Sequence, residues 1–301
     1  MTTPGILRTP DARFANLPEF PWQPRYCEVD GLRMAWVEDG DPGGEAVLLL
    51  HGEPTWSYLY RKMIPPLAAA GFRAIAPDLV GFGRSDKPAK GDAYSYARHV
   101  AWVGGFVDAL GLEDITLVCQ DWGSLIGLRL AGERPERFAR IVVANGFLPA
   151  AGFRLPAAFR AWRAFARWTP LFPAGWIVQA GCARTLPARV RRAYDAPFPS
   201  RAFQAGARAF PRLVPDGPGD PAAAANERAW AALGQWRKPF LTVFGDRDPI
   251  FAGADRALQR QVPGAKGQAH ARIRRAGHFV QEDAGEELAG HVVEFMRSTP
   301  R

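Results

Sequence analysis

Residues 115–133, ITLVCQDWGSLIGLRLAGE, join an apolar strand to a helix through one sharp turn. The run 115–119 is typical of a buried strand, and 124–133 is typical of the helix that follows. Two small residues, Cys119 and Gly123, stand two places either side of Asp121. This is the pattern of the nucleophile elbow, in which G-x-S-x-G exposes a serine. Here the central residue is an aspartate, whose carboxylate can attack a carbon that carries a leaving group.

Strand and helix patterns alternate on both sides of this turn. Such alternation is typical of the α/β class, with a mostly parallel sheet covered on both faces. The alternation stops between Pro149 and Asn226, where Ala, Arg, Pro and aromatic residues form helical patches. We therefore predict a core of residues 1–148 and 227–301 and a helical cap at 149–226, above the carboxyl ends of the strands. Strands are predicted at 26–29, 32–38, 46–50, 73–77, 115–119, 140–144 and 240–244, and helices at 58–70, 96–110, 124–133 and 284–296.

The composition indicates a globular protein of a reducing compartment. The chain has 301 residues, of which 48% are hydrophobic and 12% aromatic, enough for a large core. Its three cysteines are an odd number and widely spaced, which argues against a disulfide framework. No apolar run has the length of a membrane span, and MTTPGILRTPDARF lacks the order of a signal peptide. We predict a cytoplasmic protein, with a monomer as the default.

The net charge of +8 comes mainly from scattered arginines. Mild clusters at 189–192 and 272–275 are not accompanied by a zinc-finger, helix-turn-helix or RNA-binding pattern. We therefore expect no nucleic-acid partner and no membrane partner. The basic surface is expected to be solvated and to attract small anions.

Three residues follow one another in the order nucleophile, acid, histidine, as in α/β-hydrolases. Asp121 is at the elbow, Asp248 follows the strand 240–244, and His278 precedes the last helix. All three stand at or just after the carboxyl ends of strands, so they can converge above the sheet. Asp246 is the alternative acid, but its place in the turn itself favours a capping role.

A second loop is expected to supply the oxyanion hole. His51-Gly52-Glu53-Pro54 follows the strand 46–50 directly. In this architecture one oxyanion N–H comes from that loop and the other from the residue after the nucleophile, here Glu53 and Trp122. The role of the Glu53 side chain stays open between holding the loop and binding a water. The other histidines lack metal-ligand spacing, and 81–83 lacks a dinucleotide-binding context, so no metal or cofactor is implied.

The chain resembles the haloalkane dehalogenases of the α/β-hydrolase superfamily over almost its whole length. The resemblance rests on the segments 51–56 (HGEPTW), 120–123 (QDWG), 194–199 (YDAPFP) and 277–279 (GHF). It implies that Asp121 displaces halide from an sp³ carbon and forms an alkyl ester. His278, oriented by Asp248, would then activate the water that hydrolyses this ester. The implied substrate is a short brominated or chlorinated alkane, and the products are a primary alcohol, a halide ion and a proton.

The departing halide needs hydrogen-bond donors, and an indole N–H donates without a competing acceptor. Trp122 is expected to be the first donor. One subgroup of the family takes its second donor from an asparagine where this chain has Glu53, which is only an acceptor when ionised. The chain therefore resembles the subgroup with a cap tryptophan, predicted to be Trp162, with Trp168 as the alternative. Trp176 and Trp230 are expected to pack the cap, and the predicted pocket walls are Phe159, Leu125 and Phe165.

Three rival functions are weaker. Epoxide hydrolases share the aspartate nucleophile but hold the epoxide oxygen with two cap tyrosines, and this cap contains only Tyr194. Fluoroacetate dehalogenases follow their aspartate with arginine, where this chain has Trp122. Non-catalytic ligand-binding homologues usually lose a member of the triad, whereas this chain retains all three.

Overall fold

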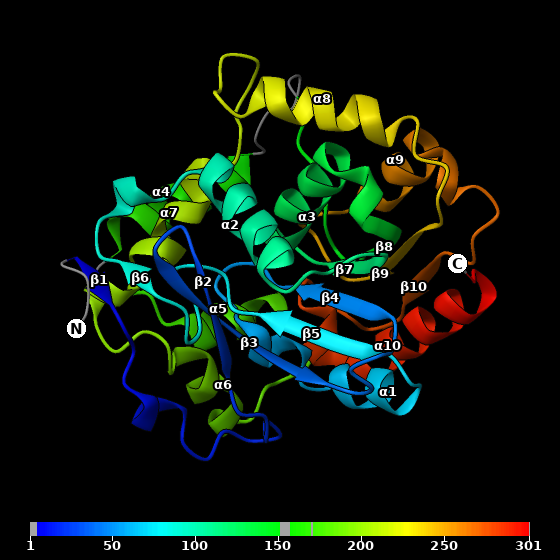
Figure 1. Ribbon diagram of the computed structural model, residues 1–301. Helices are drawn as coiled ribbons and strands as arrows, with labels where there is room; N and C mark the ends of the chain where they lie inside the picture. The colour runs from blue at the N-terminus through cyan, green and yellow to red at the C-terminus, as the bar shows by residue number, and fades with distance from the viewer. Residues whose placement is uncertain (1–4, 151–156, 170, 301) are drawn as a thin grey trace.

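An eight-stranded sheet forms the centre of the molecule (Figure 1). The architecture comes from a computed structural model that describes residues 5–150, 157–169 and 171–300. The strand order is β10-β9-β8-β7-β4-β5-β3-β2; β2 pairs antiparallel with β3, and β3 with β5, while the other pairs are parallel. The strands are β2 (Arg25–Val29), β3 (Leu32–Asp39), β4 (Ala46–Leu50), β5 (Arg73–Pro77), β7 (Ile115–Cys119), β8 (Phe138–Val143), β9 (Phe240–Gly245) and β10 (Ala271–Ile273).

The central strands are buried because helices cover both faces of the sheet. Every residue of β4 and β7 is buried. In Figure 1, α2, α3 and α8 lie on one face, and α1 and α10 lie on the other. This arrangement confirms the predicted α/β fold. The covering helices are α1 (Ile64–Ala69), α2 (Tyr96–Ala109), α3 (Trp122–Glu133), α8 (Ala223–Leu233), α9 (Ala254–Gln261) and α10 (Val280–Ser298).

Four further helices lie between β8 and the last part of the core. They are α4 (Ala157–Trp168), α5 (Ala174–Gly181), α6 (Ala188–Asp195) and α7 (Ala205–Leu213), on the side toward which β4 and β5 point (Figure 1). The predicted boundary between residues 226 and 227 falls inside α8. This helix packs on α3 so closely that a Cβ on Gly132 would lie 2.8 Å from Cα of Ala229. The division into core and cap stays a prediction, and α8 packs with the core.

The sequence prediction was incomplete for short or irregular elements. β10 was missed because it has three residues and one of them, Arg272, is exposed and pairs with Asp255 at 2.7 Å. The predicted helix 58–70 is a 3-10 turn, Ser57–Tyr60, followed by α1. The last helix begins at Val280, and Ala284 interrupts it with φ −153° and ψ 46°. Among the described residues no helix is both long and apolar enough to cross a membrane.

A first prediction concerns the glycine that lets the elbow approach β4. A Cβ on Gly123 would lie 2.0 Å from the backbone oxygen of Leu50, and neither backbone segment can move aside. We expect Gly123→Ala to lower the free energy of unfolding by about 3 kcal/mol, since overpacking a close contact is costly. The matched control is Gly290→Ala in α10, where a Cβ meets nothing within 4 Å. That change is expected to be neutral or slightly stabilising in urea unfolding; equal effects of the two substitutions would contradict the prediction.

Candidate active site

Asp121 occupies a strained turn between β7 and α3. Its backbone has φ 49° and ψ −126°, a conformation that a non-glycine residue adopts at a cost of about 1–3 kcal/mol. The turn leaves no room for a side chain at Gly52, where a Cβ would lie 2.2 Å from Oδ1 of Asp121. Hydrogen bonds hold the turn. The Asp121 N–H donates to the backbone oxygen of Asn145 at 3.0 Å, and the Ser124 hydroxyl donates to the backbone oxygen of Asp121 at 2.6 Å. The carboxylate is thereby fixed above the end of the sheet.

The predicted nucleophile, histidine and acid are brought together. Nε2 of His278 lies 3.6 Å from Oδ2 of Asp121, and Nδ1 of His278 lies 3.2 Å from Oδ2 of Asp248. The imidazole is 3% exposed and Asp248 is 6% exposed, so water screens these contacts weakly. The arrangement lets one carboxylate orient the ring while the other ring nitrogen faces the second carboxylate.

Asp246 lies on the other side of its turn. Its Oδ1 accepts a hydrogen bond from the Arg275 N–H at 2.7 Å, and it is exposed. Asp248 accepts from the Ile250 N–H at 2.8 Å through its second oxygen. Of the two predicted alternatives, only Asp248 reaches His278, while Asp246 caps the turn.

Asn145, two residues after the end of β8, was not among the predicted site residues. Its side-chain amide donates to the backbone oxygens of Gly277 at 2.7 Å and His278 at 3.0 Å, and its Oδ1 accepts from the Gly245 N–H at 2.7 Å. Its φ of 46° is in the left-handed region that asparagine tolerates better than most residues. The only signal in the sequence was a polar residue directly after an apolar strand.

Gln120 also escaped the sequence analysis. Its Nε2 donates to the His278 backbone oxygen at 3.2 Å and lies 3.1 Å from the imidazole Nε2. The side chain is fully buried, one residue before the nucleophile. Gln120 and Asn145 together hold the histidine loop from below.

Two carboxylates act on the charge of His278. Burial opposes the imidazolium, but the nearby carboxylates of Asp121 and Asp248 outweigh it and raise the pKa of His278 to about 10. The imidazole is therefore protonated at neutral pH. Because the unfolded pKa is about 6.5, this histidine stabilises the fold fully below that pH and progressively less as the pH rises toward 10.

Of the two predicted oxyanion donors, the one in the loop after β4 contacts Asp121 directly. The Glu53 N–H donates to Oδ1 of Asp121 at 2.8 Å. The Trp122 N–H is in the first turn of α3, where backbone N–H groups have no partner within the helix. His51 holds this loop in place, because its Nε2 accepts from the Leu79 N–H at 3.0 Å. Its Nδ1 lies 2.9 Å from the Gly52 backbone oxygen, so both ring nitrogens have backbone partners.

The Glu53 side chain is a buried carboxyl without a full set of partners. It is 8% exposed, and its Oε1 has no hydrogen-bond partner among the described residues. Burial, and then the Asp121 carboxylate, raise the pKa of Glu53 well above its ordinary value, against a smaller effect of His278. The neutral acid is therefore favoured. The neutral acid carries an O–H that can donate a hydrogen bond, whereas the ionised carboxylate can only accept one.

Trp122 connects the elbow to the cap helices. Its ring stacks on Phe210 of α7 at a centroid distance of 4.4 Å and meets the edge of Tyr96 at 5.3 Å. The residue is 3% exposed. The helix α4, which carries Trp162, packs in turn on α7. Trp122 and the helix that carries Trp162 thus both pack against α7.

The structure separates Trp162 from Trp168. Trp162 is partly buried against the core and lies near Phe165 and Phe172, with ring centroids 5.5 and 6.3 Å away. Trp168 is 71% exposed. An anion bound to an exposed indole would stay hydrated and gain little from it, so Trp162 is the better candidate.

The remaining predicted residues differ in burial. Leu125 is buried on α3 and Phe159 packs partly against the core, as pocket walls would. Phe165 is 46% exposed and is a poorer wall. Trp176 is exposed, with the Arg191 guanidinium 4.3 Å above its ring. The indole of Trp230 donates to the Leu148 backbone oxygen at 2.9 Å and holds α8 on the core.

Comparison with known proteins gives one consistent answer. Residues 45–285 match the family model of the alpha/beta hydrolase fold. The chain is 57% identical over 296 residues to a haloalkane dehalogenase of Mycobacterium marinum, covering 97% of this chain and 99% of that protein. It is 52% identical over 301 residues to one of Psychrobacter cryohalolentis, covering 98% and 99%. Among solved structures, the tetrameric haloalkane dehalogenase DpaA from Paraglaciecola agarilytica superposes with a TM-score of 0.88 at 38% identity, covering 95% of this chain and 96% of that chain.

A second prediction follows from the charge of His278. Asp121→Asn removes one of the two carboxylates that raise its pKa, so the imidazole should lose its proton at a lower pH than the wild-type value of about 10. A ¹⁵N NMR titration of the ring measures this. Asp246→Asn is the control, because that carboxylate binds Arg275 and does not reach the histidine. An unchanged pKa of His278 in Asp121→Asn would show that the two residues do not interact.

Proposed function

Because the chain belongs to the haloalkane dehalogenases, hydrolases that act on carbon–halide bonds, we propose that it hydrolyses short haloalkanes through a covalent ester on Asp121. The observation that carries this mechanism is a carboxylate at the elbow, 3.6 Å from a buried histidine. A carboxylate there suits attack on a carbon with a good leaving group.

In the first step an oxygen of Asp121 attacks the carbon that bears the halogen. The new C–O bond forms as the C–X bond breaks, and the bonding electron pair leaves with the halide. Oδ2 is the attacking oxygen, because Oδ1 already accepts a hydrogen bond from the Glu53 N–H. Oδ1 then becomes the carbonyl oxygen of the ester, still next to that donor.

Ester formation also prepares the base for the second step. It removes the charge of Asp121, one of the two carboxylates that keep His278 protonated. The imidazole then gives up its proton to solvent, which is the proton that the net reaction releases, and can take one from water. The resulting hydroxide adds to the ester carbonyl, and the charge on Oδ1 meets the N–H groups of Glu53 and Trp122. Collapse of the tetrahedral intermediate breaks the bond to the alkyl oxygen, which takes the proton from His278 and leaves as the alcohol, and the Asp121 carboxylate is restored.

The halide is held by the indoles of Trp122 and Trp162 in this proposal, as in the subgroup with a cap tryptophan. Support comes from the burial of Trp122, the partial burial of Trp162 and the packing of α4 on α7. An epoxide hydrolase is disfavoured because Tyr194, the cap tyrosine, is fully buried and donates to Glu282. It is therefore engaged and cannot hold an epoxide oxygen. A monomer stays a prediction; the DpaA relative is described as tetrameric.

The third prediction tests both substrate and intermediate. Wild type should release bromide from 1,2-dibromoethane and form no diol from styrene oxide. Asp121→Ala should abolish turnover. His278→Ala should release up to one halide per enzyme and then stop, with the alkyl ester on Asp121 visible by mass spectrometry. Diol formation without halide release would refute the dehalogenase proposal, and continued turnover of His278→Ala would refute the triad.

The fourth prediction concerns the second halide donor. Bromide should quench tryptophan fluorescence of the wild type, and Trp162→Phe should weaken bromide binding about tenfold, the effect of losing one hydrogen bond to an anion. Trp168→Phe is the matched control and should bind bromide as the wild type does. Weaker binding in Trp168→Phe instead would make Trp168 the second donor. If neither change weakens binding, no cap tryptophan of this pair is the donor, and Glu53→Leu then tests the neutral carboxyl of Glu53.

A further inference from the structure

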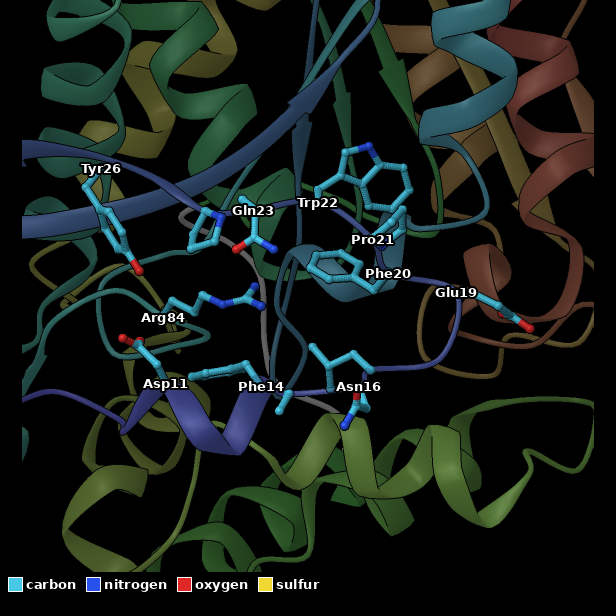
Figure 2. Close-up of a pocket in the computed structure, with 13 residues that line it drawn as sticks. Asp11, Phe14, Asn16, Glu19, Phe20, Pro21, Trp22, Gln23, Tyr26 and Arg84 are labelled. Atoms are coloured by element: carbon cyan, nitrogen blue, oxygen red, sulfur yellow. The ribbon is translucent and has the colours of Figure 1, made fainter.

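A cleft outside the catalytic site has a buried arginine among its lining residues. It has a volume of about 900 Å³ and is lined by residues of the N-terminal segment 11–26 together with Arg84. Figure 2 shows the Arg84 guanidinium in the middle of this cleft, between the side chains of Phe14 and Phe20. None of the triad residues lines it.

The Arg84 guanidinium has unused hydrogen-bonding capacity. The residue is 7% exposed, and its Nη1 has no hydrogen-bond partner among the described residues. Its backbone is fixed, because the Arg84 N–H donates to Oδ2 of Asp78 at 2.8 Å. A buried cation without a paired anion is costly, and a ligand that pairs with it recovers that cost.

Aromatic rings surround this cation. The guanidinium carbon lies 4.5 Å from the ring centroid of Phe14, 5.5 Å from that of Phe20 and 5.4 Å from that of Trp56. These rings compensate part of the buried charge. They hold Arg84 in place and leave its planar donors without an anion.

The other lining groups set the chemistry of the ligand. Trp22 and Phe20 form an apolar wall, while Gln23 and Tyr26 bring polar ends to the cleft (Figure 2). Arg84 is the only basic residue in the lining. Its fork of donors matches a carboxylate, and a single positive charge suits a monoanion better than a phosphate dianion.

Two acidic residues also line the cleft. Glu19 is engaged with Arg61 at 3.2 Å. Asp11 is exposed at the rim; its charge acts on Arg84, although that of Asp78 acts more strongly. Asp11 therefore weakens the attraction for an anion without removing it, and replacing its charge should tighten anion binding.

We propose that this cleft binds a small monocarboxylate with an apolar body, its carboxylate on the Arg84 guanidinium and its body against Phe20 and Trp22. The site is separate from the catalytic one and does not depend on the halide chemistry. The bound acid would complete the hydrogen bonding of a cation that the fold leaves buried without an acceptor.

Calorimetric titration of the whole protein with 3-phenylpropionate tests the proposal. We expect binding with a Kd on the order of 1 mM or tighter. The alcohol 3-phenylpropan-1-ol should bind at least about tenfold more weakly, since it lacks the charge. Absence of phenylpropionate binding, or tighter binding of 2-phenylethylamine, would overturn the proposal, because the latter would make the acidic rim the attractive element.

Variants locate the binding. Arg84→Gln should weaken phenylpropionate binding at least about tenfold. Since this change can also destabilise the fold, Asp11→Asn gives a second test: it should tighten binding about two- to fivefold by removing a nearby negative charge. Asp92→Asn is the matched control, another exposed aspartate at a 3-10 helix, and should bind as the wild type does.

A last pair of measurements separates the cleft from the catalytic site. Asp121→Ala should bind phenylpropionate with the wild-type affinity, and 1,2-dibromoethane should not compete. Loss of binding in Asp121→Ala, or competition by dibromoethane, would place the ligand in the catalytic site and refute the proposal. An unchanged affinity in Arg84→Gln would refute it as well.

Discussion

The catalytic geometry depends on the hydrogen bonds of one buried asparagine, Asn145. Its backbone oxygen accepts from the elbow, its amide donates to the loop of His278, and its Oδ1 accepts from the end of β9, the strand that leads to Asp248. Three loops from distant parts of the sequence are thereby fixed to one residue. Each buried group left unpaired would cost about 1–3 kcal/mol, so the loops cannot easily shift independently.

The charges of the site follow from this enforced proximity. Three carboxyl groups, those of Asp121, Asp248 and Glu53, surround one imidazole in a space that water hardly reaches. Two of them favour the imidazolium, and the third is driven toward its neutral acid. The protonation of each group therefore depends on its neighbours. A change of charge at Asp121 therefore changes the pKa of His278. In the proposed mechanism this couples formation of the ester to deprotonation of the base.

Close packing at the elbow explains the strained backbone of Asp121. A Cβ on Gly52 would collide with Asp121, and a Cβ on Gly123 would collide with β4. Glycine at these two positions thus has a steric reason. Helix α7 contacts the elbow through Phe210, which stacks on Trp122. The α7 side of the site is accordingly built from aromatic packing, while the sheet side is built from hydrogen bonds to backbone groups.

The sequence by itself predicted the α/β fold, seven of the eight strands of the central sheet and the elbow, because apolar periodicity and turn residues are local signals. It also named Asp121, His278 and Glu53 as candidate site residues. It left Asp246 and Asp248 as alternatives, and Trp162 and Trp168 likewise. Tertiary structure alone decided which aspartate reaches the imidazole and which indole is buried. It also brought Asn145, Gln120 and Arg84 into their roles. Their importance comes from partners far away in the sequence, and neither burial nor a missing hydrogen-bond partner can be known before the chain has folded.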